Sequence, residues 1–406
     1  MSAWRSALVV GLVAGIVGCR ENITTSGRCP SLCPRSNVQL ADTLLAMADS
    51  ADTSVRGFVL VREASYLLAS SLDSLQSVAL IRFTARDTSW TAADTGSLVD
   101  TEYIGRQDSV GLTLQILQRD TAVKNLRLVV YRLPAQLDTA ATYASISPYL
   151  TDAYLVDTAP VLDTAQGGSP TFRIADSLAI PPGDSGVVSL AVGIVASAKT
   201  ALTFGSGAAL TGTTAPSLTY YVHAKAPFDT TSHVLTPGTF VDLFVMNPPP
   251  AQPPPGVLAI GGIPTARASL RLSLPKVVVD SESIVRATLL FNTVGSAGGF
   301  ARDSFYVVAE PVVRDYGVKS VLWPDSSVSG KVLVHQGQSG PIELDIAPIL
   351  RFWGTTVGDS TPRLVVVRVY PEGTILGAVN FSSRSAGAAG PQLRVTYVKP
   401  YTFGVP

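Results

Sequence analysis

Two stretches of this chain, residues 185–220 and 339–397, follow the same plan. Each begins with a Ser-Gly turn that leads into an alternating apolar strand, and continues with a Phe before small polar residues. Each then ends with a Pro that opens a strand closing on Tyr. The Phe, Pro and Tyr of the two stretches lie 175–177 residues apart. That offset is too long for a solenoid repeat, so the pattern predicts two related domains.

The composition favours sheets over helices. Hydrophobic residues make up 46% of the 406 residues and charged residues 15%, with abundant Thr, Ser and Val. Helix surfaces usually carry Glu, Lys and Gln, whereas pleated sheets favour β-branched residues. We therefore expect an all-β chain of two antiparallel, jelly-roll-like β-sandwich domains in tandem, at residues 40–226 and 227–400, followed by a tail at 401–406.

Two local assignments follow from the repeat and from the spacing of apolar residues. Phe240 to Val245 resembles Gly57 to Val61, the opening strand of the first domain, so we assign it to the second domain. The proline-rich run 247–255 then becomes a stiff surface loop of the second domain rather than the link between domains. Val38 to Ala48 places Leu40, Leu44 and Met47 on one helical face and predicts a short helix.

The N-terminus carries an export signal. Its apolar run, Ala7 to Gly18, would reach about 18 Å as a helix, well short of a hydrocarbon core of about 30 Å. Residues 1–18 are therefore interpreted as a signal peptide rather than a membrane span. They lead into Cys19 through Ile16-Val17-Gly18, which resembles the lipobox of bacterial lipoproteins.

That resemblance implies cleavage before Cys19, acylation of Cys19 and a membrane anchor in the bacterial cell envelope. The alternative is an ordinary secretory signal with an incidental Cys. Arg20 follows the Cys, so the acidic inner-membrane retention signal is absent and an outer-membrane address is favoured. Residues 19–39 are polar and rich in Gly, Pro and Ser, and are interpreted as a flexible tether.

Two further cysteines lie in the tether. Cys29 and Cys33 are separated by three residues, and an exported chain permits a small structural disulfide between them. Free thiols are the alternative. Redox chemistry is disfavoured because a Cys-x-x-Cys pair has one residue fewer, and a metal site would need further ligands nearby.

Part of the second domain resembles a known family. Leu344 to Trp353 is similar to the "strand, short helix, Trp" element of DNRLRE-type jelly-roll domains. The strand Leu364 to Val369, the segment Phe381 to Arg384 and the strand Pro391 to Tyr397 also resemble that family, and the likeness covers most of residues 256–398. It implies antiparallel sandwiches on exported bacterial proteins, some of which bind polysaccharide. The first domain fits less well, because no Trp follows Val192.

Signals for catalysis and cofactors are weak. Most Asp residues precede Thr or Ser, which is typical of turns, and no calcium-loop pattern is present, although clustered loop carboxylates would be the alternative. Gly183 to Gly186 resembles a trypsin-like nucleophile segment but lacks its continuation and a matching His. We therefore expect no enzyme and no cofactor. Balanced charge, with 30 Lys+Arg against 30 Asp+Glu, argues against nucleic acid.

The remaining candidates are aromatic. Trp323, Tyr316 and Tyr306 lie in one region of the second domain and are candidate ligand-binding residues for a sugar face, the alternative being that they pack under their loop. Trp353 is expected to fill the core after the short helix. The sequence therefore predicts a non-catalytic lipoprotein with a structural or protein-interaction role in the envelope, with polysaccharide binding as the alternative.

Overall fold

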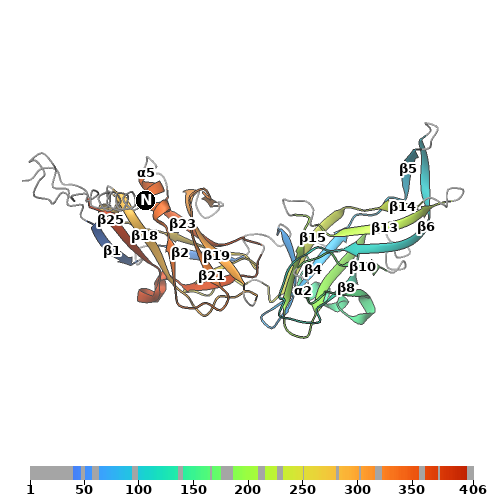
Figure 1. The fold of residues 1–406 in the computed structure, drawn as a ribbon, viewed down its shortest axis with the longest axis horizontal. Coiled ribbons are helices and arrows are strands. Elements are labelled where there is room, and N and C mark those ends of the chain that lie inside the picture. The colour runs from blue at the N-terminus through green and yellow to red at the C-terminus, as the bar shows by residue number, and fades with distance from the viewer. Residues whose placement is uncertain are drawn as a thin grey trace, which may run out of the picture.

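Strands dominate the computed structural model. It describes residues 40–46, 51–56, 64–93, 99–135, 140–164, 167–174, 186–208, 215–225, 232–249, 251–279, 283–300, 303–315, 322–355, 362–373 and 375–399. Within these ranges the strands form two antiparallel β-sandwiches that lie end to end (Figure 1). The predicted all-β sandwich class is confirmed.

The first sandwich uses one run of chain. Its larger sheet has the order β7-β12-β3-β4-β11-β8-β9, with β15 also paired to β4, and its smaller sheet has the order β10-β6-β13-β14, with β5 paired to β6. The strands are β3 (Tyr66–Leu72), β4 (Leu75–Phe83), β5 (Ser89–Ala93), β6 (Val99–Thr113), β7 (Ile116–Arg119), β8 (Arg127–Leu133), β9 (Leu155–Pro160), β10 (Thr171–Ile174), β11 (Val188–Val195), β12 (Ala201–Gly205), β13 (Ser217–Ala224), β14 (Ser232–Leu235) and β15 (Thr239–Asn247).

The second sandwich is assembled from two separate runs. One sheet has the order β1-β25-β18-β22, and the other has the order β20-β19-β23-β17-β16-β24, with β2 paired to β17 and β21 to β19. The strands are β1 (Leu40–Ala46), β2 (Asp52–Arg56), β16 (Val257–Gly261), β17 (Ala266–Arg271), β18 (Ser283–Asn292), β19 (Ser304–Arg314), β20 (Trp323–Pro324), β21 (Gly330–His335), β22 (Pro341–Asp345), β23 (Leu364–Tyr370), β24 (Ala378–Ser382) and β25 (Gln392–Val398).

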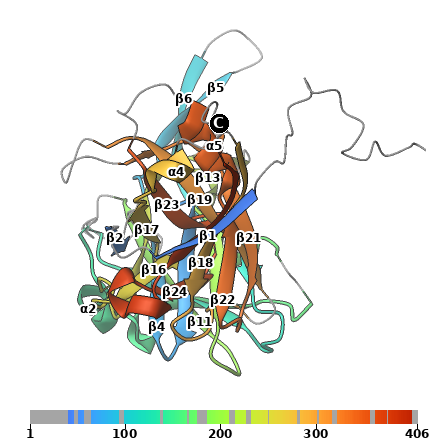
Figure 2. The same cartoon turned by 90° about the vertical axis from the view of Figure 1, so that its left-hand side faces the viewer.

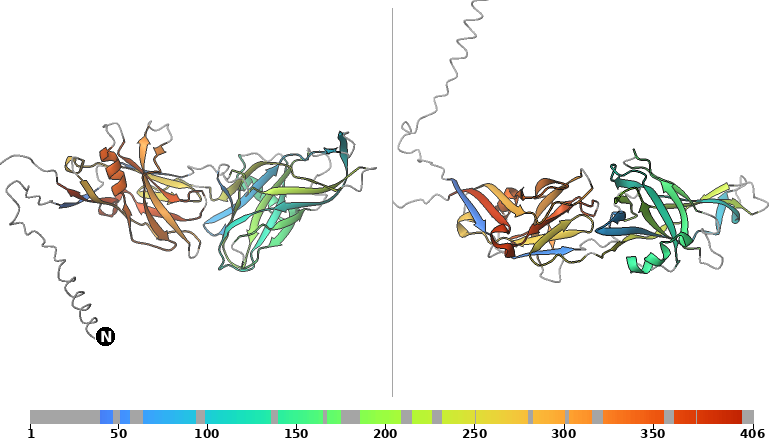
Figure 3. Two further views of the ribbon diagram at one scale, coloured as in Figure 1. Left: turned by 45° about the horizontal axis from the view of Figure 1, so that its top comes forward. Right: turned by 90° about the horizontal axis from the view of Figure 1, so that it is seen from below.

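The two N-terminal strands thus complete the C-terminal sandwich. β1 pairs with β25 over seven residues, and β2 pairs with β17 over five. In Figures 1 and 3 they are the blue arrows among orange and red strands, and Figure 2 shows β1 among the strands of the second sandwich. The Asp52 carboxylate accepts a hydrogen bond of 2.7 Å from the backbone N–H of Arg384. The Ser54 hydroxyl donates to the Ala259 carbonyl at 2.8 Å.

The two sandwiches share one strand plan, in which β1 and β2 take the places of β14 and β15. β13 lies between β6 and β14, as β25 lies between β18 and β1. β4 pairs with β3, β11 and β15, as β17 pairs with β16, β23 and β2. Each sequence repeat therefore begins with two strands that complete the sandwich formed by the other repeat. We call this arrangement the reciprocal strand exchange.

This arrangement corrects the predicted domain boundary at residues 226 and 227. Strand β15, which contains Phe240 to Val245, pairs with β4 and so belongs to the first sandwich. The proline-rich run at 247–255 consequently connects the two sandwiches, instead of looping out of the second. Residues 40–226 and 227–400 are repeats in sequence, but they are not the two sandwiches in space. The related strand at Gly57 to Val61 lies outside the described residues.

The predicted helix at Val38 to Ala48 is wrong over its described part, since Leu40–Ala46 is strand β1. Its side chains alternate, with Leu40 and Leu44 exposed and Ala41 and Leu45 packed against the core of the second sandwich. Apolar residues at a spacing of four fit one helical face, but they fit one strand face equally well. Pairing with β25 decides between the two.

The repeat holds in its later part and shifts in its earlier part. Phe204 in β12 and Phe381 in β24 are both fully buried, as are Tyr220 in β13 and Tyr397 in β25 to within a few per cent. β11, however, pairs with β4 and β8, as β23 pairs with β17 and β19 in the second sandwich. The counterpart of β11 is therefore β23. The Ser-Gly match to β22 is therefore out of register.

Short helical elements cover or cap the sheets. The long connection after β8 carries α2 (Tyr143–Ile146), η1 (Ser147–Tyr149) and η2 (Asp152–Tyr154). Ile146 is buried against the outer face of the larger sheet with Tyr143 and Tyr149 beside it, and these residues hold the connection down. In the second sandwich, α5 (Ala347–Thr355) follows β22, and its Trp353 packs against the core as predicted. The other short helices are α4 (Lys276–Val279) and η3 (Arg384–Ala389).

The sandwiches meet through a small apolar cluster. The first contributes Leu68, Phe244 and Met246 and the second Ile263, Phe300 and Leu376, with Ala64 and Ala201 completing the set. At its side, Gln118 donates to the Asp303 carboxylate at 2.9 Å. Burial, opposed by a backbone hydrogen bond at Phe300, raises the pKa of that carboxyl. The contact is therefore apolar at its centre with one polar bond beside it.

The reciprocal strand exchange predicts how fragments fold. A fragment of residues 64–247 contains every strand of the first sandwich and should fold alone. A fragment of 256–399 lacks β1 and β2, and should be less stable than the same fragment fused behind residues 40–56, by on the order of 3 kcal/mol for the lost Leu45 burial and strand hydrogen bonds. Urea unfolding followed by circular dichroism measures the difference, and equal stability of the two forms would contradict the exchange.

Candidate functional site

The aromatic residues predicted from sequence do not form one platform. Trp323 lies in β20 and is 64% exposed, and it pairs with Arg314 at the end of β19. Tyr306 lies near the start of β19, where the Lys331 ammonium sits 5.5 Å from its ring centre. The eight-residue separation along β19 amounts to about 26 Å. Tyr316 lies outside the described residues, so a role for each ring separately stays a prediction.

The N-terminal predictions also fall outside the described ranges, which begin at residue 40. These are the acylation site Cys19 and the candidate disulfide between Cys29 and Cys33. Among the helices that the structure describes, none has the length and apolar character needed to cross a bilayer.

Several aspartates act in turns, whereas Asp42 and Asp108 lie in strands β1 and β6. The Asp163 carboxylate accepts from the backbone N–H of Asn125 at 3.0 Å, and that of Asp345 accepts from Ala347 at the start of α5 at 2.9 Å. Side-chain and backbone hydrogen bonds from Ser327 lower the pKa of Asp325. Across the described ranges, no three His, Cys, Asp or Glu side chains gather as metal ligands would.

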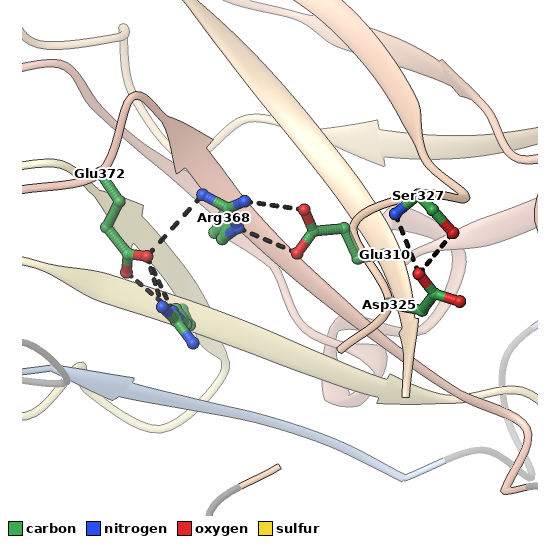
Figure 4. A network of polar contacts seen from close by, with 6 residues as sticks. Glu310, Asp325, Ser327, Arg368 and Glu372 are labelled. Atoms are coloured by element: carbon green, nitrogen blue, oxygen red, sulfur yellow. Dashed lines mark hydrogen bonds and ion pairs between the residues drawn. The ribbon is translucent and has the colours of Figure 1, made fainter. Parts of the chain in front are cut away.

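A network of charged side chains runs along one sheet of the second sandwich, over β19, β23 and β17 (Figure 4). Arg368 in β23 donates to both carboxylate oxygens of Glu310 in β19, at 3.0 and 2.7 Å. Arg267 in β17 forms a similar fork with Glu372 at 2.6–3.0 Å, and Arg368 lies 3.9 Å from Glu372. Burial opposes the charge on Arg368, but Glu310 outweighs it and raises the pKa of Arg368. Two positive and two negative charges thus satisfy one another and tie three strands together.

A second polar group lies at the distal end of the first sandwich, the end farthest from the second, where the β5–β6 hairpin projects (Figures 1 and 3). Trp90 and Glu102 face each other across the β5–β6 pair. His233 in β14 lies against them, with 4.1 Å between the Trp90 and His233 ring centres and 3.4 Å between His233 Nε2 and Glu102 Oε2. Glu102 is 9% exposed.

The same face continues with a tyrosine and an arginine. Arg86, in the connection before β5, donates to the Gln107 side chain at 2.7 Å and lies 5.2 Å from the ring centre of the buried Tyr220. Burial raises the pKa of Tyr220 to about 12, although Arg86 opposes the rise, so the phenol keeps its proton at neutral pH. We call Arg86, Trp90, Glu102, Tyr220 and His233 the distal polar cluster.

Five atoms of the distal polar cluster are buried without a hydrogen-bond partner. They are Arg86 Nε, Trp90 Nε1, Glu102 Oε2, Tyr220 Oη and His233 Nε2. The His233–Glu102 separation of 3.4 Å permits electrostatic attraction, but its geometry makes no hydrogen bond. The distal polar cluster therefore differs from the charged network, whose hydrogen bonds are all made internally.

The outer face of the same sheet is partly apolar. Tyr221 in β13 lies directly opposite Val234 in β14, and both are exposed, as is Tyr103 in β6. Between them the Nε2 of His223 lies 2.7 Å from the Asp108 carboxylate. This sheet, the smaller sheet of the first sandwich, is called the distal sheet. Its outer face is partly apolar and aromatic, and its inner face packs in the apolar core, with the distal polar cluster beside it.

Sequence reasoning missed the distal polar cluster. Its members come from three separate segments and share no local motif. The signal that could have drawn attention is rarity, because Trp90 is one of four Trp and His233 one of three His in the chain. Their proximity depends on β5 pairing with β6 and β14 with β13.

No family model and no curated protein sequence matches this chain. Among solved structures, an alignment with the Macrobrachium rosenbergii nodavirus structure covers 93% of this chain and 97% of that chain, at 9% identity and a TM-score of 0.19. A superposition that poor carries no information on function.

The charged network predicts a large effect of one substitution. Glu310→Ala should destabilise the protein by about 3–5 kcal/mol, because it leaves the Arg368 guanidinium buried without its carboxylate. The exposed Glu343→Ala should change stability by less than about 0.5 kcal/mol. Urea unfolding measures both. A double variant, Glu310→Leu with Arg368→Met, should lose less than Glu310→Ala alone, and equal effects of Glu310→Ala and Glu343→Ala would contradict this account.

Proposed function

We propose that this chain is a non-catalytic, lipid-anchored protein of the bacterial cell envelope with a structural or protein-interaction role at the outer membrane. The observation that supports this most is the reciprocal strand exchange. It ties residue 40, which follows the tether, into the second sandwich, while the hairpin β5–β6 lies at the far end of the first. A lipid on Cys19 would therefore hold the second sandwich near the membrane and present the distal sheet outward.

Exposed apolar side chains at the presented end support an interaction role. Tyr103, Tyr221 and Val234 are each 45–59% exposed on the outer face of the distal sheet. Exposed aromatic rings are enriched where proteins contact one another. The resemblance of residues 256–398 to DNRLRE-type jelly-roll domains forms part of this proposal, since it implies an exported bacterial protein.

Polysaccharide binding is the second candidate role. The Trp323 ring favours it, since it is 64% exposed in the second sandwich and an exposed indole can lie against a sugar face.

The first test asks whether Cys19 is acylated. Cells supplied with an alkyne fatty-acid analogue should incorporate label into the wild-type protein and not into Cys19→Ala, because acylation requires that thiol. Cys29→Ala, a matched cysteine change in the tether, should label like wild type. Equal labelling of wild type and Cys19→Ala, seen by in-gel fluorescence, would refute lipidation and leave the distal end to be tested separately.

The second test asks whether the outer face of the distal sheet contacts another envelope protein. A photo-crosslinking amino acid at position 103 should capture an envelope protein in intact cells, whereas the same amino acid at Val285, exposed on the second sandwich, should not. Western blotting and mass spectrometry of the adducts provide the measurement. Adducts from Val285 alone would place the interaction on the other sandwich.

A further inference from the structure

Three exposed side chains form one row across the second sandwich. The strand register places Tyr306 in β19 directly opposite Leu333 in β21 on one side and Tyr370 in β23 on the other. Residues directly opposite each other in antiparallel strands point to the same face of the sheet. This face is the outer one, because Phe305 and Val307, the neighbours of Tyr306, lie in the core. We call the row of Leu333, Tyr306 and Tyr370 the tyrosine strip.

The tyrosine strip is accessible but narrow. Its members are 40–53% exposed, whereas Val308 and Glu310, the next outward-facing residues along β19, are 7% and 2% exposed. Adjacent strands lie about 4.8 Å apart, so the strip runs roughly 10 Å across three strands. A stable protein contact buries about 800 Å² on each partner, which is more than three half-exposed side chains provide. The strip therefore fits a narrow, elongated ligand better than the surface of a folded protein.

Each ring of the tyrosine strip has a cation against one of its faces. Lys331 Nζ lies 5.5 Å from the ring centre of Tyr306, and Arg368 Cζ lies 5.7 Å from that of Tyr370. The Glu310 carboxylate accepts both hydrogen bonds of the Arg368 fork, so the guanidinium beside Tyr370 is held in place (Figure 4). The exposed area of each ring therefore lies on its other face and along its edge, which includes the hydroxyl.

A chain of sugar rings matches these surfaces. One face of a pyranose carries C–H groups that pack against an aromatic ring, while its hydroxyls need hydrogen-bond partners. The phenol groups of Tyr306 and Tyr370 can donate and accept, and the Lys331 ammonium can donate. The rings of a linear pyranose chain repeat at close to the strand spacing of about 5 Å, so neighbouring sugars can reach neighbouring strands. Leu333 extends the apolar surface at the end of the strip.

We propose that the tyrosine strip binds a chain of pyranose sugars, with successive rings against Tyr306 and Tyr370 and an apolar contact to Leu333. This inference rests on the second candidate role above and gives it a site. It moves the sugar contact from Trp323, which pairs with the far end of β19, to a row about 26 Å away along that strand. Tyr306 was a candidate from sequence, whereas Tyr370 joins it only through the pairing of β19 with β23.

Isothermal titration of the purified full-length protein provides the test. The probes are soluble hexasaccharides of glucose, mannose, galactose and N-acetylglucosamine, with a galacturonate hexasaccharide as the acidic form that Lys331 would favour. At least one probe should bind saturably, and Tyr370→Ala should weaken it by about fivefold or more, because one ring contact is lost. Tyr370→Phe keeps the ring and should retain most of the affinity. Tyr221→Ala, the same change at a tyrosine of similar exposure in the first sandwich, should leave the affinity unchanged.

A second readout locates the ligand and guards against misfolding. In hydroxyl-radical footprinting, the bound probe should protect Leu333, Tyr306 and Tyr370 from oxidation and leave Tyr221 and Trp323 unchanged. The melting temperature of each variant should stay within a few degrees of wild type, because the substituted side chains lie at the surface. Protection of the strip in wild type and not in Tyr370→Ala would tie the affinity loss to this site.

Three results would overturn the proposal. One is the absence of saturable binding by every probe, which would also remove the polysaccharide role. Another is binding that Trp323→Ala abolishes and Tyr370→Ala leaves intact, since the second candidate role would then hold at Trp323 and not at the tyrosine strip. The third is equal affinity of wild type and of the double variant Tyr306→Ala with Tyr370→Ala, which would place any sugar site elsewhere. None of these results bears on acylation of Cys19, which the labelling experiment decides independently.

Discussion

The hydrogen bonds of β1 with β25 and of β2 with β17 are the contacts on which the rest of this structure depends. They place the N-terminal strands in the C-terminal sandwich, and the counterpart strands β14 and β15 complete the first sandwich in return. The exchange sends the chain between the sandwiches twice, after β2 and after β15. Ala64, which follows the first crossing, and Met246, which precedes the second, both belong to the apolar cluster with Phe300. The same exchange separates the tether from the distal sheet.

The sequence predicted much of this fold because its signals are local. Alternation identified most strands, and the paired Phe and Tyr of the two repeats proved to be buried at equivalent places in β12, β13, β24 and β25. The sequence did not predict which sheet each N-terminal strand joins, and the reason is physical. The sandwiches share one plan, so β2 fits the edge offered by β17 and, by the same pattern, the edge offered by β4. Alternation fixes which face of a strand is buried, but it does not fix which of two equivalent sheets the strand joins.

The candidate site shows a similar division. Trp353 was correctly expected in the core, since an apolar helix after a strand must bury one face. The distal polar cluster was not found, because its members share no local motif and Glu102 and His233 meet only through long-range strand pairing. Buried polar groups need hydrogen-bond partners, and the charged network and the distal polar cluster differ in whether the chain supplies them. Arg368 and Glu310 satisfy each other within the chain, whereas Trp90 Nε1 and Glu102 Oε2 are buried without a hydrogen-bond partner.

The reciprocal strand exchange also sets the order in which the chain can assemble during synthesis. The first sandwich has all its strands once residue 247 has been made, whereas β1 must wait for residues 392–398 before its partner β25 exists. Hydrogen bonds such as that from Thr396 to Asp42 span 354 residues. Contacts of such long range close slowly, and an unpaired strand is prone to join other chains in the meantime. β1, the earliest-made strand, is thus the last to be paired, and until then its backbone hydrogen-bonding groups are open to other chains at the N-terminal end of each new molecule.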